Sequence, residues 1–169
     1  MKLDFLFSAL AALVPLVIGF IWYSPKLFGN VWMKETGLTE EKIKSGNMPL
    51  ILGLSFLFSF LIAITLHMSV IHQWGFFSML DPGKVVAGGD EAAFFKEGMA
   101  KFGNTFRTFG HGALHGGLTA LFLVLPIMAT NALFERKTAK HVAINVGYWV
   151  ITLALMGGII CQFADVVIA

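Results

Sequence analysis

The sequence predicts an all-α membrane protein in which four helices cross a lipid bilayer. Of its 169 residues, 57% are hydrophobic and only 13% are charged, whereas soluble domains carry about 25% charged residues. The charged residues leave four long uncharged runs, at residues 5–23, 50–71, 109–134 and 142–161. A run of about 20 apolar residues is long enough to cross the hydrocarbon core. We therefore expect a single transmembrane domain over residues 1–169.

Helices are expected in these runs because a lipid-exposed backbone must satisfy its own hydrogen bonds, and no run alternates as a barrel strand does. The first run is read as a retained helix and not as a cleaved leader. Lys2 is followed by Asp4, and the apolar run is longer than the core of a usual signal peptide. A net charge of +2 gives no argument for nucleic-acid binding. The single cysteine, Cys161, cannot form an internal disulfide.

The first helix is expected to kink at Pro15 and to leave the membrane through aromatic residues interleaved with lysines. Such rings prefer the headgroup layer, so Trp22, Tyr23 and Trp32 are predicted to be interfacial anchors. The alternative is that these aromatic residues line a groove for a lipid or another ligand. Thr39 should begin a short helix in this first loop.

Small residues recur at four-residue spacing in the other helices, a pattern typical of closely packed membrane helices. The second helix has Ser55, Ser59 and Ala63 in such a line, followed by His67. The third has the pairs Gly112–Gly116 and Ala113–Gly117, and the fourth has Ala154–Gly158. Pro126 is expected to kink the third helix.

The second loop, residues 72–108, is long for a small helical bundle. Asp90 can cap a helix that runs to about Lys101. Its apolar residues Ala93, Phe94 and Met99 could lie on the membrane surface. Short interfacial helices are therefore expected in both the first and the second loop.

Four of the five histidines must lie toward one end of the bundle, because the second loop joins the second and third helices. They are His67, His72, His111 and His115. His111 and His115 are four residues apart and share a helix face, so both can reach one metal ion, with His67 as a third ligand. This candidate site of His67, His111 and His115 could alternatively bind haem or relay protons. Hydrogen bonding of these histidines to backbone, neighbours or headgroups is the structural alternative.

A second polar group is expected at the opposite end, where the third and fourth helices are joined by a short loop. Asn131 and Asn145 face each other there and could hydrogen-bond across the helix interface. The functional alternative to this structural role is a polar vestibule formed by Asn131, Glu135, Arg136, Asn145 and Tyr148. No phosphate-binding loop, catalytic triad or pair of intramembrane carboxylates is present, so no catalytic residue is assigned.

Lysine and arginine are denser in the first and third loops, with seven residues, than on the opposite side, with five over a longer length. This distribution predicts that the first and third loops are cytoplasmic and that both termini lie outside.

Three strings carry a resemblance to a known family: GFIWYSPKLFGNVWMKETG (19–37), HGALHGGLTALFLVLPIMATNALFERK (111–137) and INVGYWVITLALMGG (144–158). They resemble the domain-of-unknown-function family 1761, a group of small bacterial membrane proteins. The resemblance covers three of the four helices and implies a four-helix protein of the bacterial inner membrane. It implies no activity, so no functional residue follows from it.

Three functions from different classes fit these observations. The first is a membrane protein without enzymatic activity that associates with itself through its small-residue faces or serves as an accessory subunit. The second is a channel or transporter assembled as an oligomer, because four helices enclose little pore on their own. The third is a metal or haem protein built on the histidines. The lipid bilayer and further copies of the chain or other membrane subunits are therefore the expected partners.

Overall fold

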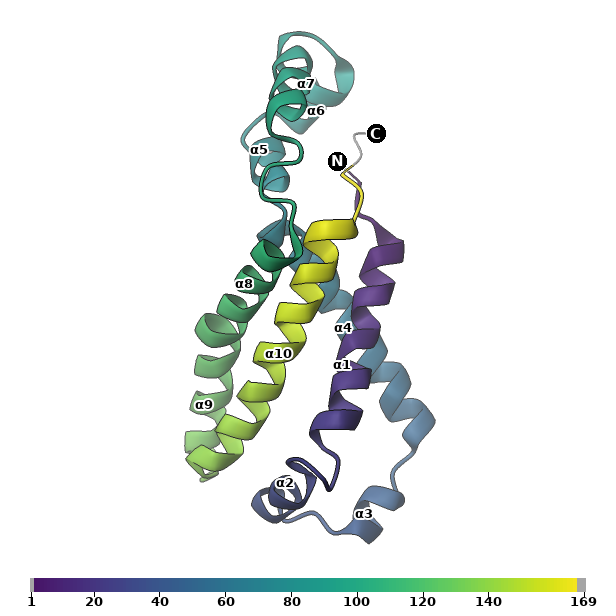
Figure 1. The fold of residues 1–169 in the computed structure, drawn as a ribbon, viewed down its shortest axis with the longest axis vertical. Coiled ribbons are helices and arrows are strands. Elements are labelled where there is room, and N and C mark those ends of the chain that lie inside the picture. Colours follow the sequence, from purple (N-terminus) through teal and green to yellow (C-terminus); the bar gives the residue numbers. More distant parts are fainter. Residues whose placement is uncertain (1, 167–169) are drawn as a thin grey trace.

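The computed structural model describes residues 2–166. Most of these residues are helical, and none of them forms a strand. Four helices are long and apolar enough to cross a membrane, as predicted. They are α1 (Phe5–Trp22), α4 (Met48–Val70), the third span from Phe109 to Phe134, and α10 (Ala139–Phe163). Figure 1 shows them running side by side along the long axis of the molecule.

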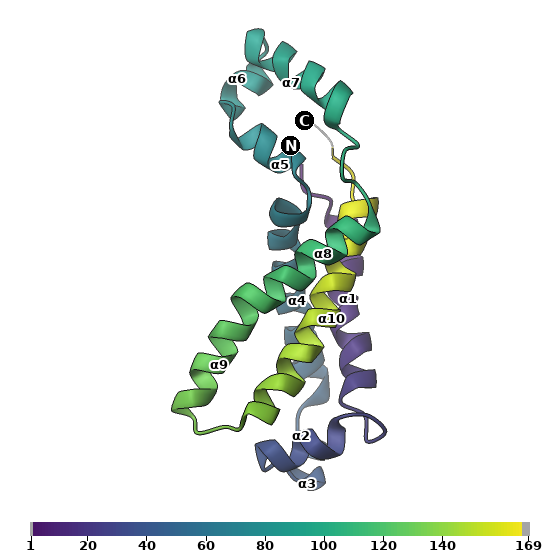
Figure 2. The same cartoon turned by 60° about the vertical axis from the view of Figure 1, so that its left-hand side comes forward.

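Helix α10 is the centre of the bundle. In its most apolar 18-residue stretch 61% of the residues are buried, against 22%, 17% and 11% for the first, second and third spans. It packs against α1, α4 and the third span, and Figures 1 and 2 show it between the third span and α1. The other three spans therefore expose most of their apolar surface, as lipid-facing helices do.

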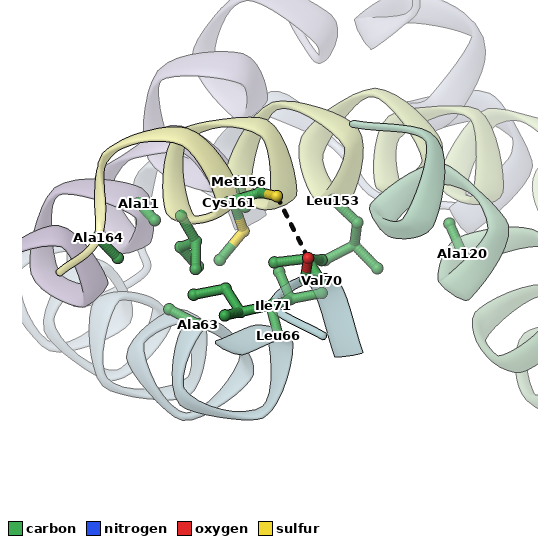
Figure 3. Close-up of a cluster of buried hydrophobic side chains, with 11 residues drawn as sticks. Ala11, Ala63, Leu66, Val70, Ile71, Ala120, Leu153, Met156, Cys161 and Ala164 are labelled. Atoms are coloured by element: carbon green, nitrogen blue, oxygen red, sulfur yellow. Dashed lines mark hydrogen bonds between the residues drawn. The ribbon is translucent and has the colours of Figure 1, made fainter. Parts of the chain in front are cut away.

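The best-packed part of the core lies toward the end of the bundle where α4 and α10 finish. Figure 3 shows buried apolar side chains from α1, α4 and α10 packed together there, among them Ala11, Ala63 and Met156. The dashed line marks the thiol of Cys161, which donates to the Val70 carbonyl at 3.2 Å. Cys161 is thus a buried structural residue.

The predicted glycine pairs are used inside the chain. A Cβ on Gly112 would lie 2.1 Å from the Gly157 carbonyl oxygen, and one on Gly116 would lie 1.9 Å from that of Leu153. Only glycine permits this backbone contact between the third span and α10. These glycines therefore hold the bundle together and are not available for contacts between copies of the chain.

The third span contains α8 (Phe109–Thr119), a π-helical segment η1 (Ala120–Val124) and α9 (Leu125–Phe134). The Leu125 N–H bonds to the Ala120 carbonyl, five residues back. Pro126 follows directly and lacks the N–H that a regular helix requires. The irregularity expected at Pro126 is thus a widened turn just before it.

Both loops contain short helices. The first loop holds α2 (Gly29–Thr36) and α3 (Glu40–Lys44), and Thr39 caps α3 as expected. The second holds α5 (Gln73–Ser78), α6 (Pro82–Ala87) and α7 (Asp90–Phe102). Gly89, with a φ of +103°, occupies the cap position of α7, so Asp90 is the first helical residue and not the cap. Figures 1 and 2 show that α5–α7 extend beyond the end of the bundle. Phe94 belongs to α7 and is exposed.

Candidate functional site: three histidines at the second loop

Three imidazoles meet where the second loop joins the bundle. One ring nitrogen from each of His72, His111 and His115 lies within 4.8 Å of the others. The Nε2 atoms of His72 and His111 are 2.8 Å apart. A tetrahedral ion with Zn–N bonds of about 2.0–2.1 Å separates its ligand nitrogens by about 3.3 Å. The observed spacings bracket that value, so small rotations of the rings would bring all three onto one ion.

Helix α8 directs two of these histidines. The Thr108 hydroxyl caps the helix by accepting from the His111 N–H at 3.2 Å. The glycine face of α8, formed by Gly112 and Gly116, is pressed against α10. His111 and His115 each precede one of these glycines, so they share the neighbouring face. The packing of α8 therefore presents both imidazoles toward the end of α4.

His72 comes from the other end of the second loop. Helix α4 ends at Val70, and His72 is the cap residue of α5. The next residue, Gln73, donates from Nε2 to the carbonyls of Phe102 at 2.8 Å and Thr105 at 3.1 Å. These bonds join the beginning of the loop to its end. His72 thereby reaches His111, although 39 residues separate the two in the sequence.

Phe106 covers the histidine cluster in a strained backbone conformation. Its φ is +61°, which is unusual for an aromatic residue. Its ring stacks on His111 with centroids 4.9 Å apart and meets His72 edge-on at 5.8 Å. Such strain persists only where the surroundings impose it, and it is concentrated at functional sites.

Arg107 supplies part of that restraint. Its Nε donates to the Cys161 carbonyl at 2.6 Å, and its Nη2 donates to the Ala164 carbonyl. The guanidinium group therefore caps the carboxyl end of α10, where the helix dipole favours a cation. Burial lowers the pKa of Arg107, an effect that Cys161 and Asp165 oppose. Arginine begins so far above neutrality that the group remains charged.

His67 does not join the cluster. It is only 1% exposed, and its Nδ1 bonds to the Ala63 carbonyl at 2.9 Å within α4. Its Nε2 is buried and has no hydrogen-bond partner among the described residues. The histidine that meets His111 and His115 is instead His72, which the order of the chain had placed at the same end of the bundle.

The residues of the expected vestibule do not assemble into one site. Asn145 accepts a hydrogen bond at 2.9 Å from Tyr23 and donates to the His141 carbonyl at 2.8 Å. Tyr148 donates to the Pro15 carbonyl at 2.9 Å. The remaining three, Asn131, Glu135 and Arg136, are exposed. The expected bond between Asn131 and Asn145 is absent from the described part of the chain, because Asn145 points to α1.

The aromatic residues at the end of α1 also contact α10. Trp22 donates from Nε1 to the Ile144 carbonyl at 3.0 Å, and the Tyr23 and Trp32 rings lie 5.2 Å apart. Tyr23 and Tyr148 line an apolar groove of about 810 Å³ between α1, α4 and α10. The sequence predicted interfacial anchors, with a groove lining as the alternative, but it could not reveal the hydrogen bonds of Trp22 and Tyr23 to residues 122 positions away.

Comparison with known proteins adds one finding. A family model described as a protein of unknown function (DUF1761) matches residues 6–161, which include all three histidines. No curated protein and no solved structure matches the chain.

Proposed function

Because the chain belongs to the DUF1761 family, for which no function is described, we propose a function from the geometry: a membrane protein that binds a transition-metal ion through His72, His111 and His115. The supporting observation is the approach of three imidazoles from the two ends of one loop. The restrained Phe106 ring over the cluster also supports it.

The ligand set favours a first-row ion such as Zn²⁺. Imidazole suits Zn²⁺, Cu²⁺ and Ni²⁺, whereas Mg²⁺ and Ca²⁺ prefer oxygen ligands. Three protein ligands also leave one tetrahedral position for water or a solute. Haem fits poorly, because the three rings contact one another at centroid distances of 4.5–5.0 Å and leave no space for a porphyrin between them.

Metal analysis of detergent-purified protein tests this function. After loading with Zn²⁺ and extensive dialysis, native mass spectrometry and elemental analysis should find one zinc ion per chain. A variant with His72, His111 and His115 all changed to Ala should retain none. The His141→Ala variant is the matched control, because His141 lies at the opposite end of the bundle and should leave the stoichiometry unchanged. Equal zinc in the triple variant and the unaltered protein would exclude this site.

We further propose that the chain resides in a bacterial inner membrane with both termini outside, so that the histidine cluster lies at the outer face. The density of Lys and Arg in the first and third loops supports this orientation. The exposed residues Ser78 and Ser45 allow a test, since they lie in the second and first loops. In intact cells a membrane-impermeant maleimide should label Ser78→Cys and not Ser45→Cys. The native Cys161 is fully buried and gives little background. Labelling of Ser45→Cys and not of Ser78→Cys would show that both termini lie on the cytoplasmic side.

A second candidate function is that of an accessory or self-associating membrane subunit. The observation that favours it is apolar surface outside the spans, where Met79 is 82% exposed and Phe94 and Phe102 are about 60% exposed. Exposed apolar patches outside the spans mark surfaces that bind another protein or the membrane. Light scattering of the purified protein, compared with a Met79→Lys and Phe94→Lys variant, tests whether copies associate through this unit. A monomer in both cases would leave only a different protein as the partner.

A further inference from the structure

We propose that the groove between α1, α4 and α10 binds one phospholipid, with both acyl chains in the groove and an anionic headgroup at Lys26. The groove has a volume of about 810 Å³ and lies at the end of the bundle opposite to the histidine cluster. The proposal is therefore independent of any metal ion.

The groove exists because the first half of α4 stands away from the rest of the bundle. Every residue from Met48 to Leu54 is exposed, whereas the buried residues of α4 all lie between Ser59 and Val70. Figures 1 and 2 show α1 and α4 apart at the end of the bundle that carries α2 and α3. The groove opens between these two apolar spans, so lipid hydrocarbon and not water lies at its opening.

The walls of the groove suit acyl chains. Among the described residues that line it, none carries a charge. The Tyr23 hydroxyl donates to the Asn145 Oδ1 atom, and the Tyr148 hydroxyl donates to the Pro15 carbonyl, each at 2.9 Å. Because both hydroxyl groups are used within the protein, the tyrosines offer a ligand the surfaces of their rings. A polar solute would lose its hydration there without gaining hydrogen bonds from these tyrosines.

The size of the groove distinguishes lipid chains from a helix of another protein. Its α4 wall extends from Met48 to Ile62, which is about 21 Å of helix. A volume of about 810 Å³ over that length gives a mean cross-section of about 40 Å². A helix with its side chains is about 10–12 Å across and needs about 80–110 Å². Alkyl chains whose carbon atoms pack at about 4–4.5 Å need about 20 Å² each, so the two chains of one phospholipid match the groove.

The mouth of the groove lies at the level of lipid headgroups and carries a free cation. Tyr23 lines the groove, and its ring lies 5.2 Å from that of Trp32. Such aromatic residues gather at the headgroup layer. Lys26 directly follows Pro25, which also lines the groove. Lys26 is exposed and forms no ion pair within residues 2–166. Its ammonium group is therefore available to a lipid phosphate.

Native mass spectrometry of detergent-purified protein tests the proposal. The protein is titrated with phosphatidylglycerol, which is anionic, and with phosphatidylcholine that has the same acyl chains and no net charge. We expect one high-affinity lipid per chain and a preference of about fivefold for phosphatidylglycerol, the effect of one lysine near an anionic headgroup. Equal affinity for the two lipids would overturn the assignment of the headgroup to Lys26.

Two pairs of variants connect the binding to the groove. Ser55→Trp fills the groove and should weaken both lipids at least tenfold, whereas Leu57→Trp, on the same helix but outside the groove, should not. Ser55→Leu adds less bulk and should act in the same direction, with helical circular dichroism as the check on folding. Lys26→Gln should abolish the preference for phosphatidylglycerol. Lys140→Gln removes an equal charge from the third loop and should preserve that preference.

Two results would contradict a lipid in this groove. The first is equal lipid binding by folded Ser55→Trp, Ser55→Leu and Leu57→Trp, which would place the lipid elsewhere. The second is a dimer that dissociates in Ser55→Trp and persists in Leu57→Trp, which would show that a second copy of the chain occupies the groove.

Discussion

His67 and His72 are five residues apart, yet only His72 reaches the histidines of α8. His67 lies within α4, where its ring is held against the Ala63 carbonyl and faces the core. His72 lies beyond the end of that helix, where the chain turns into α5. The sequence placed four histidines at one end of the bundle, but spacing alone could not choose among them. That choice depends on where α4 ends and on how Gln73 closes the loop.

Single substitutions at these two positions should therefore differ in their effect on zinc. Substitution of a group that only supports a metal ligand costs about 10–100-fold in affinity. We expect His72→Gln, which removes a ligand, to weaken zinc binding by at least about 100-fold and His67→Gln to leave one zinc per chain. Competition with a chelating dye measures both affinities. Similar losses of zinc affinity in the two variants would show that His67 also contributes to the metal site.

Arg107 is predicted to stabilise the end of the bundle that carries the site. Arg107→Ala leaves the carbonyls of Cys161 and Ala164 without their charged donor. Hydrogen bonds to charged groups contribute about 1.5–3 kcal/mol each, so we expect a loss of about 2–4 kcal/mol, the two bonds sharing one partially exposed group. Chemical denaturation followed by circular dichroism measures this loss. Lys96→Ala, an exposed change on α7, is the control and should be neutral. Equal unfolding midpoints would show that Arg107 contributes nothing.

At the scale of elements, uncharged runs located the spans well, and capping residues explain the differences in their ends. Helix α10 begins at Ala139, three residues before the predicted start, because Thr138 accepts from the His141 N–H at 3.1 Å. Its first turn is polar, so hydrophobicity could not detect it. Helices α5 and α6 were also missed, since each has only six residues. Helix α5 is held against α7 by the stacking of Phe76 on Phe95, and α6 begins where Asp81 accepts from the Gly83 and Lys84 N–H groups.

The contact between α8 and α10 should tolerate no added methyl group at Gly116. A Cβ there meets the Leu153 carbonyl oxygen at 1.9 Å, whereas one on Gly117 lies 4.0 Å from its nearest neighbour, the Ala154 Cβ. Overpacking costs about 1–3 kcal/mol, so Gly116→Ala should destabilise the protein by at least that amount. Gly117→Ala should be neutral or slightly stabilising, because Ala favours helix. Thermal unfolding in detergent compares the two variants; matching midpoints would mean that α8 and α10 are not in backbone contact.

For the whole molecule, an ion held by His72, His111 and His115 would join the two ends of the second loop. Such an ion would fasten the α5–α7 unit to the membrane bundle. The proposed metal site therefore affects the position of a complete unit and not only three side chains.

Zinc should accordingly raise the stability of the folded protein. At a free concentration of 100 times its Kd, a ligand that binds only the folded state stabilises it by about 2.7 kcal/mol. We expect zinc to raise the thermal midpoint and to slow proteolysis within residues 73–108. Mg²⁺ should do neither, because it prefers oxygen ligands. The triple histidine variant should not respond to zinc; a response of equal size there would place the ion elsewhere.

The central position of α10 also has a consequence for biosynthesis. Translation delivers the spans in order, so α1, α4 and the third span enter the membrane before the helix around which they pack. Helices α1 and α4 contact each other and can pair early. The glycine face of α8 packs against α10, so it stays in contact with lipid until α10 is inserted. The last span to be synthesised is thus the one that completes the assembly, and with it the approach of His111 and His115 to His72.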